Sequence, residues 1–321
     1  MKIGILNCSD IARRRMIPAM KSIPGIDITI VCSRSKEKAK EYAKEFNIPQ
    51  YTDNPEDLFI GLDAVYISSP PSEHYESMTE FISRGINVLC EKSLTISSNH
   101  TESIIRDAKQ FGVIVQENYG FQFHPQWKYI IKSLKDLGDI ISIKSGFEFP
   151  PRDASTDFRY NKDLGGGALL DAGGYPIKAA SLIMSKINLG EISGSYRFSS
   201  ELEIDTSGNV YFLDDKGTSA FLTWSFETPY KCDLEIIGTK GKIKSRKIFT
   251  PKADENVTVE KTDMFGKIIE TKEFKADHFR ELIIDFKRRI DEGDNSHFSE
   301  IIKQSNWQSY AKSTGFRTIL N

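Results

Sequence analysis

The stretch Ile3-Gly4-Ile5-Leu6-Asn7-Cys8-Ser9-Asp10-Ile11-Ala12 decides how the first part of the chain folds. Its apolar beginning has no polar alternation, and a turn and a helical pattern follow at once, which predicts a buried strand, a tight turn and a helix. The same order recurs up to about residue 117, with amphipathic segments at 36–46 and 73–84. Strands of this kind separated by helices predict a parallel sheet with helices on both faces. The predicted strands are Ile3–Leu6, Ile28–Cys32, Ala64–Ile67, Asn87–Cys90 and Val113–Gln116.

The turn after the first strand occupies the place of the G-x-G-x-x-G/A fingerprint that binds dinucleotides. Asn7 and Ser9 stand where this fingerprint has its first two glycines. Asn is the non-glycine residue best suited to a left-handed turn, the small Ser9 lets a pyrophosphate approach the backbone, and Ala12 permits close helix–strand packing. The helix that opens near Asp10 and Ile11 offers free N–H groups to an anion. A strand–helix turn without a ligand is the alternative.

The end of the second predicted strand indicates which dinucleotide would fit. Folds that prefer the unphosphorylated cofactor place Asp or Glu there, where it binds the ribose hydroxyls. This chain has Cys32-Ser33-Arg34 and then Lys36, which gives a hydroxyl and two cations suited to a 2′-phosphate. We therefore expect NADP(H), with NAD(H) as the alternative cofactor. An exposed basic turn that opens a helix would explain the same residues without any ligand.

Two further strand ends carry candidate ligand groups. Ser69, Pro70 and His74 follow the third strand, where the prolines fix an extended turn. Glu91 and Lys92 follow the fourth strand, and a lysine at this place would lie in the crevice where parallel sheets bind ligands. The alternative for Lys92 is a surface lysine paired with Glu91.

The Gly-rich segment from Gly165 to Lys178 carries the candidate catalytic groups. Asp171 and Tyr175 are four residues apart, so they share a face on a helix, and Lys178 follows on the same side. An acid, a phenol and an amine on one face suit the movement of a proton beside a substrate. Pro176 predicts a kink or a restart of the helix at Tyr175. A half-buried helix with a satisfied Asp is the alternative.

A polar loop at 152–162 precedes the Gly-rich segment and supplies candidate substrate contacts. Arg159 could reach a phosphate or a sugar hydroxyl, and Tyr160 follows it directly. A surface salt bridge is the alternative for Arg159. The candidate substrate contacts are therefore Arg159, Tyr160 and Lys178.

The second half of the chain predicts a different kind of sheet. A helix is predicted from Pro125 to about Leu137 and a strand at Ile141–Phe149. After Leu189, alternating runs are joined by short turns, which predicts antiparallel pairing. Helical segments near 276–293 and 299–315 are predicted to close the chain. The predicted strands after Leu189 are Glu191–Phe198, Asn209–Leu213, Ser219–Phe226, Cys232–Ile237, Lys242–Phe249 and Val257–Lys261.

Composition excludes several classes of protein. The 321 residues suggest about two domains, and 39% hydrophobic with 27% charged residues is ordinary for a globular protein. A formal charge of −2 argues against a general role on nucleic acids or membrane surfaces. No run approaches the ~18 apolar residues that span a bilayer. The scattered cysteines and histidines show no zinc or disulfide spacing, so we expect no metal and a cytoplasmic location.

Taken in order, these motifs resemble the glucose–fructose oxidoreductase / inositol dehydrogenase / MocA (Gfo/Idh/MocA) family over nearly the whole chain. Within the family, Asn7–Met16 and Tyr175-Pro176 most resemble the nucleotide-sugar C-3 ketoreductases. Ser93 departs from the proline that follows the active-site lysine in the family. The matching marks are Asp10-Ile11-Ala12, Ser68–His74, Glu91-Lys92-Ser93, Phe123-His124-Pro125 and Asp171-x-Gly-x-Tyr175.

The resemblance implies two domains and a bound nicotinamide dinucleotide. A Rossmann domain at 1–118 would be followed at 119–321 by an α+β domain whose large, open, mostly antiparallel sheet joins subunits into a homodimer or homotetramer. By position, Lys92 is the family's active-site lysine, Asp171 is its acid, and Tyr175 stands where members have His or Tyr. The expected cofactor contacts are Asn7, Ser9, Asp10, Ile11, Ser33, Arg34, Lys36, Ser69, Pro70, His74, Glu91 and Lys92.

These expectations favour NADP(H)-dependent hydride transfer to or from a carbonyl or hydroxyl carbon of a sugar, with a nucleotide-linked keto-deoxyhexose as the expected substrate. An NAD-dependent dehydrogenase of a free sugar, inositol or a dihydrodiol is the first alternative. The second alternative is a non-catalytic regulator that keeps the nucleotide fold, which would suit the missing glycines of the fingerprint.

Overall fold

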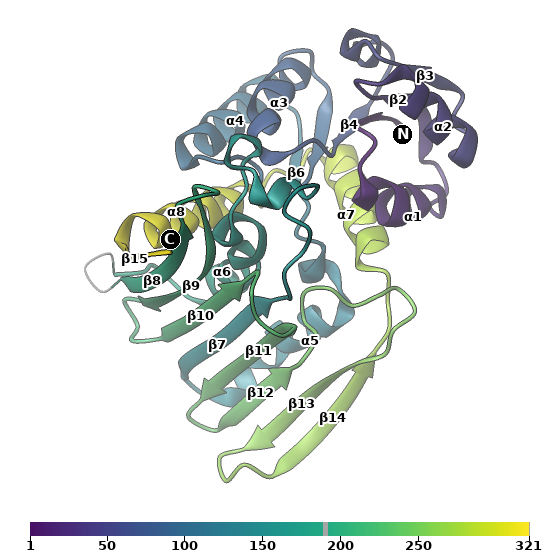
Figure 1. The fold of residues 1–321 in the computed structure, drawn as a ribbon. Coiled ribbons are helices and arrows are strands. Elements are labelled where there is room, and N and C mark those ends of the chain that lie inside the picture. The colour runs from purple at the N-terminus through teal and green to yellow at the C-terminus, as the bar shows by residue number, and fades with distance from the viewer. Residues whose placement is uncertain (189–191, 321) are drawn as a thin grey trace. The chain divides into compact units, whose positions relative to one another are not determined.

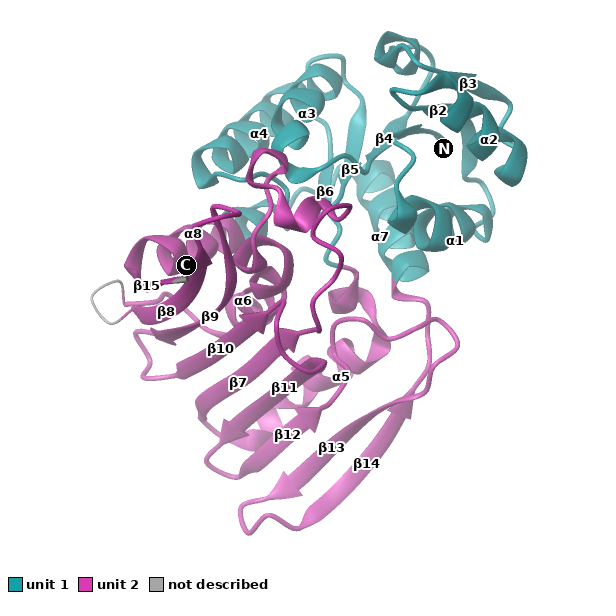
Figure 2. Cartoon of the chain, viewed as in Figure 1, with its two compact units in different colours: residues 1–119, 279–302 teal, residues 120–278, 303–321 magenta. Residues whose placement is uncertain are grey.

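The chain forms two compact units. A computed structural model describes residues 1–188 and 192–320 (Figure 1). The first unit comprises Met1–Tyr119 and Phe279–Ile302, and the second comprises Gly120–His278 and Lys303–Asn321 (Figure 2). Among the described residues, no helix combines the length and the apolar character that a membrane crossing requires.

The first unit is built on a six-stranded parallel sheet with the order β3-β2-β1-β4-β5-β6. The chain fills one half of this sheet with β1 to β3 and then the other half with β4 to β6, so the order reverses between β1 and β4. Sheets of this doubly wound kind bind ligands at that switch point, beyond the carboxyl ends of the strands. The strands are β1 (Lys2–Leu6), β2 (Asp27–Cys32), β3 (Gln50–Thr52), β4 (Ala64–Ile67), β5 (Asn87–Cys90) and β6 (Val115–Glu117).

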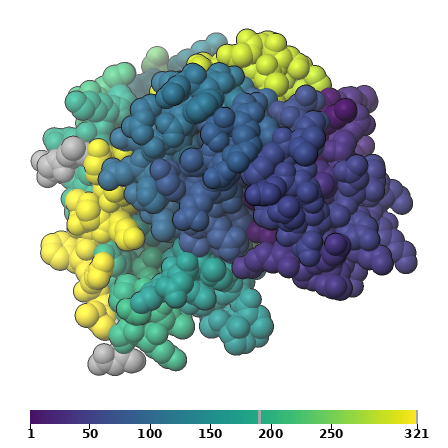
Figure 3. Space-filling model, turned by 90° about the horizontal axis from the view of Figure 1, so that it is seen from above, coloured from purple at the N-terminus to yellow at the C-terminus, as the bar shows by residue number. Residues whose placement is uncertain are grey.

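Helices follow the strands as the sequence pattern predicts. α2 begins after Ser35, whose Oγ accepts the Lys38 N–H at 3.2 Å, and it ends at Asn47, which takes the left-handed conformation. In a space-filling view the N-terminal part of the chain, purple to blue, forms one continuous surface (Figure 3). The helices of this part are α1 (Ile17–Lys21), α2 (Lys36–Phe46), α3 (His74–Ile82) and α4 (Ser98–Phe111).

The segment Phe279–Ile302 belongs to the first unit although it follows most of the second unit in sequence. It contains most of α7 (His278–Glu292) and the start of α8 (Phe298–Thr314). Phe298 and Ile301 are buried in one core with strands β4 to β6 and helices α3 and α4. The sequence prediction placed this segment in the second domain, 119–321. An apolar helix face has the same sequence pattern whichever sheet it covers, so the sequence could not assign the segment to the first sheet.

The second unit is built on a nine-stranded sheet with the order β14-β13-β12-β11-β7-β10-β9-β8-β15. Its neighbours pair antiparallel except β7 with β10 and β8 with β15, which are parallel. The predicted fold class, a doubly wound parallel sheet followed by a large and mostly antiparallel one, is confirmed. The strands are β7 (Ile140–Glu148), β8 (Ser193–Ser199), β9 (Ile204–Leu213), β10 (Ser219–Ser225), β11 (Lys231–Gly238), β12 (Gly241–Ser245), β13 (Val257–Asp263), β14 (Ile268–Phe274) and β15 (Gly315–Leu320).

Several strand predictions needed correction. β3, β14 and β15 were not predicted, and the described part of the chain ends in a strand that pairs with β8 and not in the predicted closing helix. β14 is exposed along nearly its whole length, so it lacks the alternation that marks a half-buried strand. The strand predicted at Lys242–Phe249 ends at Ser245, and β9 begins five residues earlier than predicted, at Ile204. Glu191, the predicted start of the strand before it, lies outside the described residues.

Helices α5 (Pro125–Ser133) and α6 (Gly174–Ile183) belong to the second unit. α5 continues into a 3₁₀ turn that ends at Leu137, which is where the sequence predicted the end of this helix. α6 is preceded by a π-helical turn, Leu169–Gly173, so the helical path changes its hydrogen bonding immediately before Tyr175. The predicted restart of the helix at Tyr175 is therefore found one residue earlier, at Gly174. Pro176 falls in the first turn of α6, where a missing N–H is tolerated.

Candidate active site

The turn after β1 has the backbone shape that its sequence predicts. Asn7 takes a left-handed conformation with φ of 75°, so the prediction made for it is confirmed. Its N–H donates to the Cys32 carbonyl at 3.0 Å, and its own carbonyl accepts from the Ser68 hydroxyl at 2.9 Å. The turn is therefore fixed from both neighbouring strands, β2 and β4, and not only by its own residues.

Ser9 links this turn to two helices. Its Oγ accepts the Ala12 N–H at 3.2 Å, and its carbonyl accepts from the Tyr42 hydroxyl at 2.8 Å. The following Asp10 forms an ion pair with Arg14, and Ile11 immediately precedes a π-helical turn at Ala12–Met16. π-helical turns are rare and occur often at functional sites. The turn thus presents the start of a helix beside the switch point, as a pyrophosphate site requires.

The residues after β2 present cations to the solvent. Ser33 is buried, and its N–H donates to the Thr52 carbonyl at 3.2 Å. The side chain of Arg34 is 81% exposed and lies 3.6 Å from Glu73, and that of Lys36 lies 3.8 Å from Asp53. Exposed pairs of this kind contribute only ~0–1 kcal/mol, so either cation can turn to a stronger anion at little cost.

His74 connects the loops that follow β4 and β5. Its ring is fully buried, with Nε2 2.8 Å from the Ser69 carbonyl and Nδ1 3.0 Å from the Ser93 carbonyl. Burial lowers the pKa of His74, against the effect of these carbonyls. The hydroxyl of Ser69 is buried and has no hydrogen-bond partner among the described residues. Pro70 is extended at the entrance to α3. His74 therefore fixes the loop that carries Lys92, and its contact with a cofactor stays a prediction.

Glu91 points into a buried group of polar side chains. Its Oε1 accepts from the Tyr66 hydroxyl at 2.7 Å and from Nδ2 of Asn118 at 2.6 Å. Burial raises the pKa of Glu91, although these two hydrogen bonds and the charge of Lys92 act in the opposite direction. The peptide bond between Lys92 and Ser93 is cis. Tyr66 and Asn118 lie beside the candidate site and were missed by the sequence analysis, because Tyr66 is inside an apolar strand, Asn118 follows one, and neither belongs to a motif.

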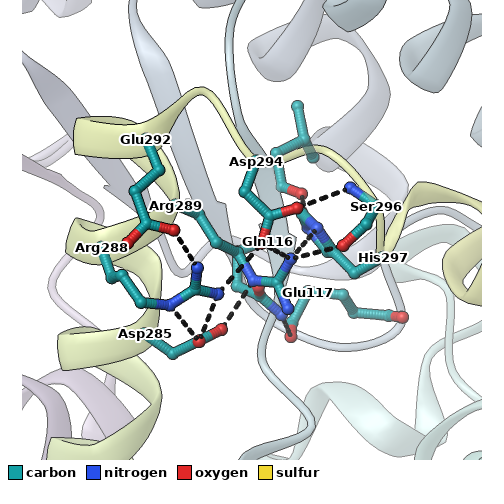
Figure 4. A network of polar contacts seen from close by, with 10 residues as sticks. Gln116, Glu117, Asp285, Arg288, Arg289, Glu292, Asp294, Ser296 and His297 are labelled. Carbon is teal, nitrogen blue, oxygen red and sulfur yellow. Dashed lines mark hydrogen bonds and ion pairs between the residues drawn. The ribbon is translucent and has the colours of Figure 1, made fainter.

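A network of polar contacts around Arg289 and His297 reaches β6 (Figure 4). Arg289 donates through Nε to Asp285 at 2.6 Å and through Nη1 to Asp294 at 3.0 Å. Nη1 also lies 2.9 Å from Nδ1 of His297, whose Nε2 lies 2.9 Å from the Val115 carbonyl. Because arginine can only donate, Nδ1 is the acceptor and Nε2–H donates to β6.

This support reaches the loop after Lys92. β6 ends at Glu117, whose Oε1 accepts the Leu94 N–H at 2.8 Å. The segment that returns late in the chain therefore positions the strand against which the Lys92 loop is hydrogen-bonded.

In the second unit, two positions of the Gly-rich segment have no room for a side chain, and hydrogen bonds hold the segment in place. A Cβ at Gly166 would lie 2.5 Å from the Arg159 carbonyl oxygen, and one at Gly167 would lie 2.6 Å from Oδ1 of Asp205. The Gly167 N–H donates to the Arg159 carbonyl at 2.9 Å. Asp205 also accepts the Leu169 N–H at 2.7 Å, and burial raises its pKa to about 6. Asp205 is a third residue that the sequence analysis missed.

Tyr175 is surrounded by phenylalanine rings. Its ring centroid lies 4.9 Å from that of Phe147, 5.4 Å from that of Phe249 and 6.2 Å from that of Phe121. An apolar environment on these sides leaves few orientations for the ring, which suits a group that must present its hydroxyl at one place. Lys178, one turn further along α6, is 2% exposed.

Asp171 forms an ion pair with Arg159. Nε of Arg159 donates to Oδ2 of Asp171 at 2.8 Å. The Tyr160 hydroxyl accepts the Arg152 N–H at 3.0 Å. The structure thus brings Asp171 and Arg159 together, and the roles of Arg159, Tyr160 and Lys178 toward a substrate stay predictions.

The candidate residues are distributed over both units. Lys92 and the expected cofactor contacts lie in the first unit, and Asp171, Tyr175 and Lys178 lie in the second. The combination of Lys92 with Tyr175 in one site therefore stays a prediction. Among the described residues, no group of three or more His, Cys, Asp or Glu side chains could hold a metal ion.

Comparison with known proteins decides the family. Residues 1–119 match the model of the Gfo/Idh/MocA oxidoreductase family with its NAD-binding Rossmann fold, and residues 130–244 match the model of the family's C-terminal domain. A dTDP-3,4-didehydro-2,6-dideoxy-α-D-glucose 3-reductase of Actinomadura kijaniata is 30% identical over 256 residues, which cover 79% of this chain and 76% of the relative. The chain belongs to the Gfo/Idh/MocA oxidoreductase family.

A further relative and a solved structure extend the comparison. A D-xylose 1-dehydrogenase (NADP⁺) of Haloferax volcanii is 28% identical over 301 residues, which cover 92% of this chain and 90% of the relative. The crystal structure of a 3-ketoreductase from Actinomadura kijaniata in complex with NADP and TDP-benzene has a TM-score of 0.91 and 27% identity, covering 100% of this chain and 99% of that one. Family membership makes the chain an oxidoreductase and identifies its first unit as the dinucleotide-binding one.

Proposed function

We propose that the protein is an NADP(H)-dependent ketoreductase that acts on a carbonyl or hydroxyl carbon of a nucleotide-linked keto-deoxyhexose. The observation that carries this proposal is the similarity over the full length of the chain to a 3-ketoreductase solved with NADP and TDP-benzene, at a TM-score of 0.91. The exposed guanidinium of Arg34, at a strand end without a carboxylate, supports the phosphorylated cofactor.

The polar groups at the strand ends fit a dinucleotide. Asn7, Ser9 and the helix start after Ile11 would hold the pyrophosphate, and Arg34 would bind the 2′-phosphate. The Ser69 hydroxyl, after β4, and Oδ1 of Asn118, after β6, are buried and lack hydrogen-bond partners among the described residues. Buried polar atoms without partners are rare in proteins and suit the polar groups of a ligand. When bound, the dinucleotide supplies or accepts the hydride.

The proton would be moved by this chain's own side chains. During reduction the sugar carbonyl oxygen gathers negative charge and needs a proton, and Tyr175 is the proposed donor. The charge of Lys92 would stabilise the oxyanion, and Asp171 would orient the phenol or a sugar hydroxyl. Lys92 and Tyr175 could exchange these roles. The phenylalanine rings around Tyr175 support a fixed donor, since they limit the orientations of its ring.

Replacement of Tyr175 by Phe tests this assignment. Positioned proton transfer accelerates a reaction by ~10²–10⁴-fold, so Tyr175→Phe should lower turnover about that much. The Kd for NADPH, measured by fluorescence titration, should stay close to that of the wild type, because the ring and its packing are retained. Unchanged turnover with a dTDP-linked 3-ketosugar and NADPH would reject Tyr175 as the donor.

A second candidate function is the NADP-dependent oxidation of a free aldose. The similarity to a D-xylose 1-dehydrogenase (NADP⁺) over 92% of this chain favours it. Parallel assays with a dTDP-linked 3-ketosugar and NADPH, and with free aldoses and NADP⁺, separate the two candidates through kcat/KM. An NAD-linked reaction would be indicated instead if NADH supported higher kcat/KM than NADPH.

The C-terminal sheet is the proposed subunit contact. Tyr211, Leu213 and Phe221 lie on the same face of β9 and β10, and Phe221 is 49% exposed. An exposed phenylalanine beside two partly exposed apolar side chains on one sheet face supports a homodimer or homotetramer. Native mass spectrometry would give the number of subunits. The four cysteines are all buried and free, which supports the reducing environment of a cytoplasm.

A further inference from the structure

Arg159 lies between two carboxylates in the second unit. Its Nε donates to Oδ2 of Asp171 at 2.8 Å, and its Nη1 lies 3.0 Å and 3.2 Å from the two oxygens of Asp157. The side chains of Arg159, Asp157 and Asp171 are 23%, 14% and 11% exposed. This is a mostly buried arrangement in which one cation serves two anions.

The charges of the cluster favour the ionised form of Asp171. Burial by itself would lower the pKa of Arg159, but the charges of Asp171 and Asp157 outweigh it and raise that pKa above its ordinary value. Interaction between two charges is mutual, so the guanidinium stabilises the carboxylate of Asp171 as much as the carboxylate stabilises the guanidinium. Asp157 has a second cation, Arg152, at 3.5 Å. Because Arg152 partly neutralises Asp157, the negative charge of Asp157 cancels less of the effect of Arg159 on Asp171.

Backbone hydrogen bonds help to hold Arg159 close to Asp171. Oδ1 of Asp157 accepts the Arg159 N–H at 3.0 Å and so begins a short 3₁₀ turn, Phe158–Tyr160. The Arg159 carbonyl accepts the Gly167 N–H at 2.9 Å, four residues before Asp171. The loop that carries the cation is therefore attached to the segment that carries the anion. Further titratable groups on the elements beside this segment are Asp205 on β9, Tyr175 and Lys178 on α6, and Arg152, Asp153, Tyr160, Lys162 and Asp163 in the loop.

We infer that Arg159 is a positioning residue that keeps Asp171 ionised and oriented, so that Asp171 acts as a hydrogen-bond acceptor and not as the proton donor of the reaction. This inference rests on the proposed function for its catalytic part. An ionised Asp171 can accept a hydrogen bond from a phenol or a sugar hydroxyl, whereas it has no proton to give. The donor must then be another group, which agrees with the role proposed for Tyr175.

The first arm of the test does not depend on turnover. The carboxyl carbons of aspartate would be labelled with ¹³C, and the Asp171 signal would be assigned with Asp171→Asn and followed by NMR against pH. In Arg159→Gln, Asp171 should take up its proton about one to two pH units higher than in the wild type, which is the worth of a charged hydrogen bond. Arg152→Gln is the matched control, because Arg152 pairs with Asp157 at 3.5 Å and is 51% exposed. This control should move the titration of Asp171 far less than Arg159→Gln does, because Arg152 acts on Asp171 only through Asp157 in this account.

The second arm measures kcat against pH with NADPH and a dTDP-linked 3-ketosugar. Arg159→Gln should lose about 10- to 100-fold in kcat on the acid side, where Asp171 has become protonated, and should recover most of this loss at alkaline pH. KM for NADPH should not change. Arg159→Lys should restore most of the acid-side activity, since it keeps the charge. Asp157→Asn removes the competing negative charge and keeps an acceptor for Arg159. It should move the Asp171 titration in the opposite direction to Arg159→Gln, and so decides the matter if Arg159→Gln does not fold.

The two arms separate this inference from the proposed function. An unchanged titration of Asp171 in Arg159→Gln, or an equal change in Arg152→Gln, would overturn the positioning role. An acid-side loss that Arg159→Lys does not reduce would overturn it as well. A wild-type protein that turns over no nucleotide-linked ketosugar would overturn the proposed function, and the NMR titration would still decide whether Arg159 keeps Asp171 ionised.

Discussion

Replacement of Arg34 by Gln should change the choice of cofactor and not the ability to bind one. The guanidinium is 81% exposed and its ion pair with Glu73 spans 3.6 Å. Such a surface pair is worth ~0–1 kcal/mol, so little is lost when Arg34 turns toward a phosphate. A hydrogen bond between charged groups contributes ~1.5–3 kcal/mol. Loss of this contact corresponds to an affinity for NADPH about 10- to 150-fold weaker.

The affinity for NADH should remain within about twofold of the wild type, because NADH carries no 2′-phosphate to contact. Isothermal titration calorimetry with NADPH and with NADH gives both values for each variant. Arg106→Gln is the control, since Arg106 is 70% exposed and pairs with Asp107 at 3.7 Å in the same unit. Glu73→Gln should act in the opposite direction, with NADPH bound up to about fivefold more tightly, because it removes a competitor for Arg34. Equal losses for both cofactors, or the same result in Arg106→Gln, would refute this assignment of Arg34.

Two further predictions concern the second unit. Burial lowers the pKa of His124 to about 4. An unfolded histidine titrates near ~6.5, so the folded protein binds this proton more weakly and stability should fall as pH drops from ~6.5 to ~4, by ~3 kcal/mol. His124→Asn keeps an acceptor for the Gln126 N–H. In urea unfolding, its free energy of unfolding should fall by ~3 kcal/mol less between pH 7 and pH 4 than that of the wild type. Equal falls in the two proteins would contradict this. Gly166→Ala would place a methyl group 2.5 Å from the Arg159 carbonyl oxygen, so thermal unfolding should show a destabilisation of ~1–3 kcal/mol, and an unchanged Tm would count against the tight packing.

The sequence was most informative where one residue type decides the backbone. Asn7 was predicted to take a left-handed turn and does so, because few residues other than glycine tolerate that conformation. β4, β5 and α2 have the predicted bounds, since the two strands are continuous apolar runs and the helix has an amphipathic pattern, all with clear ends. β14 escaped prediction because a strand exposed on both faces has no alternation to detect.

The partners of the candidate groups were harder to predict than the groups themselves. Lys92 and Asp171 are recognisable from the residues around them, but nothing near Glu91 in the sequence points to Tyr66 or Asn118. The link of His297 to β6 spans 182 positions in the sequence, so no local pattern carries it. Polar contacts over such separations depend on the fold as a whole, and only the structure reveals them.

Two carboxylates beside the candidate catalytic groups have opposite environments. Glu91 is buried among the neutral donors Tyr66 and Asn118, and burial raises its pKa. Asp171 instead has the guanidinium of Arg159 at 2.8 Å, which favours its ionised form. The raised pKa of Glu91 opposes negative charge next to Lys92, whose own charge is the one proposed to stabilise a developing oxyanion. An ionised carboxylate four residues before Tyr175 is, in turn, able to orient a hydroxyl that gives up its proton. The same chemical group thus has two different environments, because Glu91 has neutral donors as partners and Asp171 has a cation; under the proposed function the first would favour charge stabilisation and the second proton transfer.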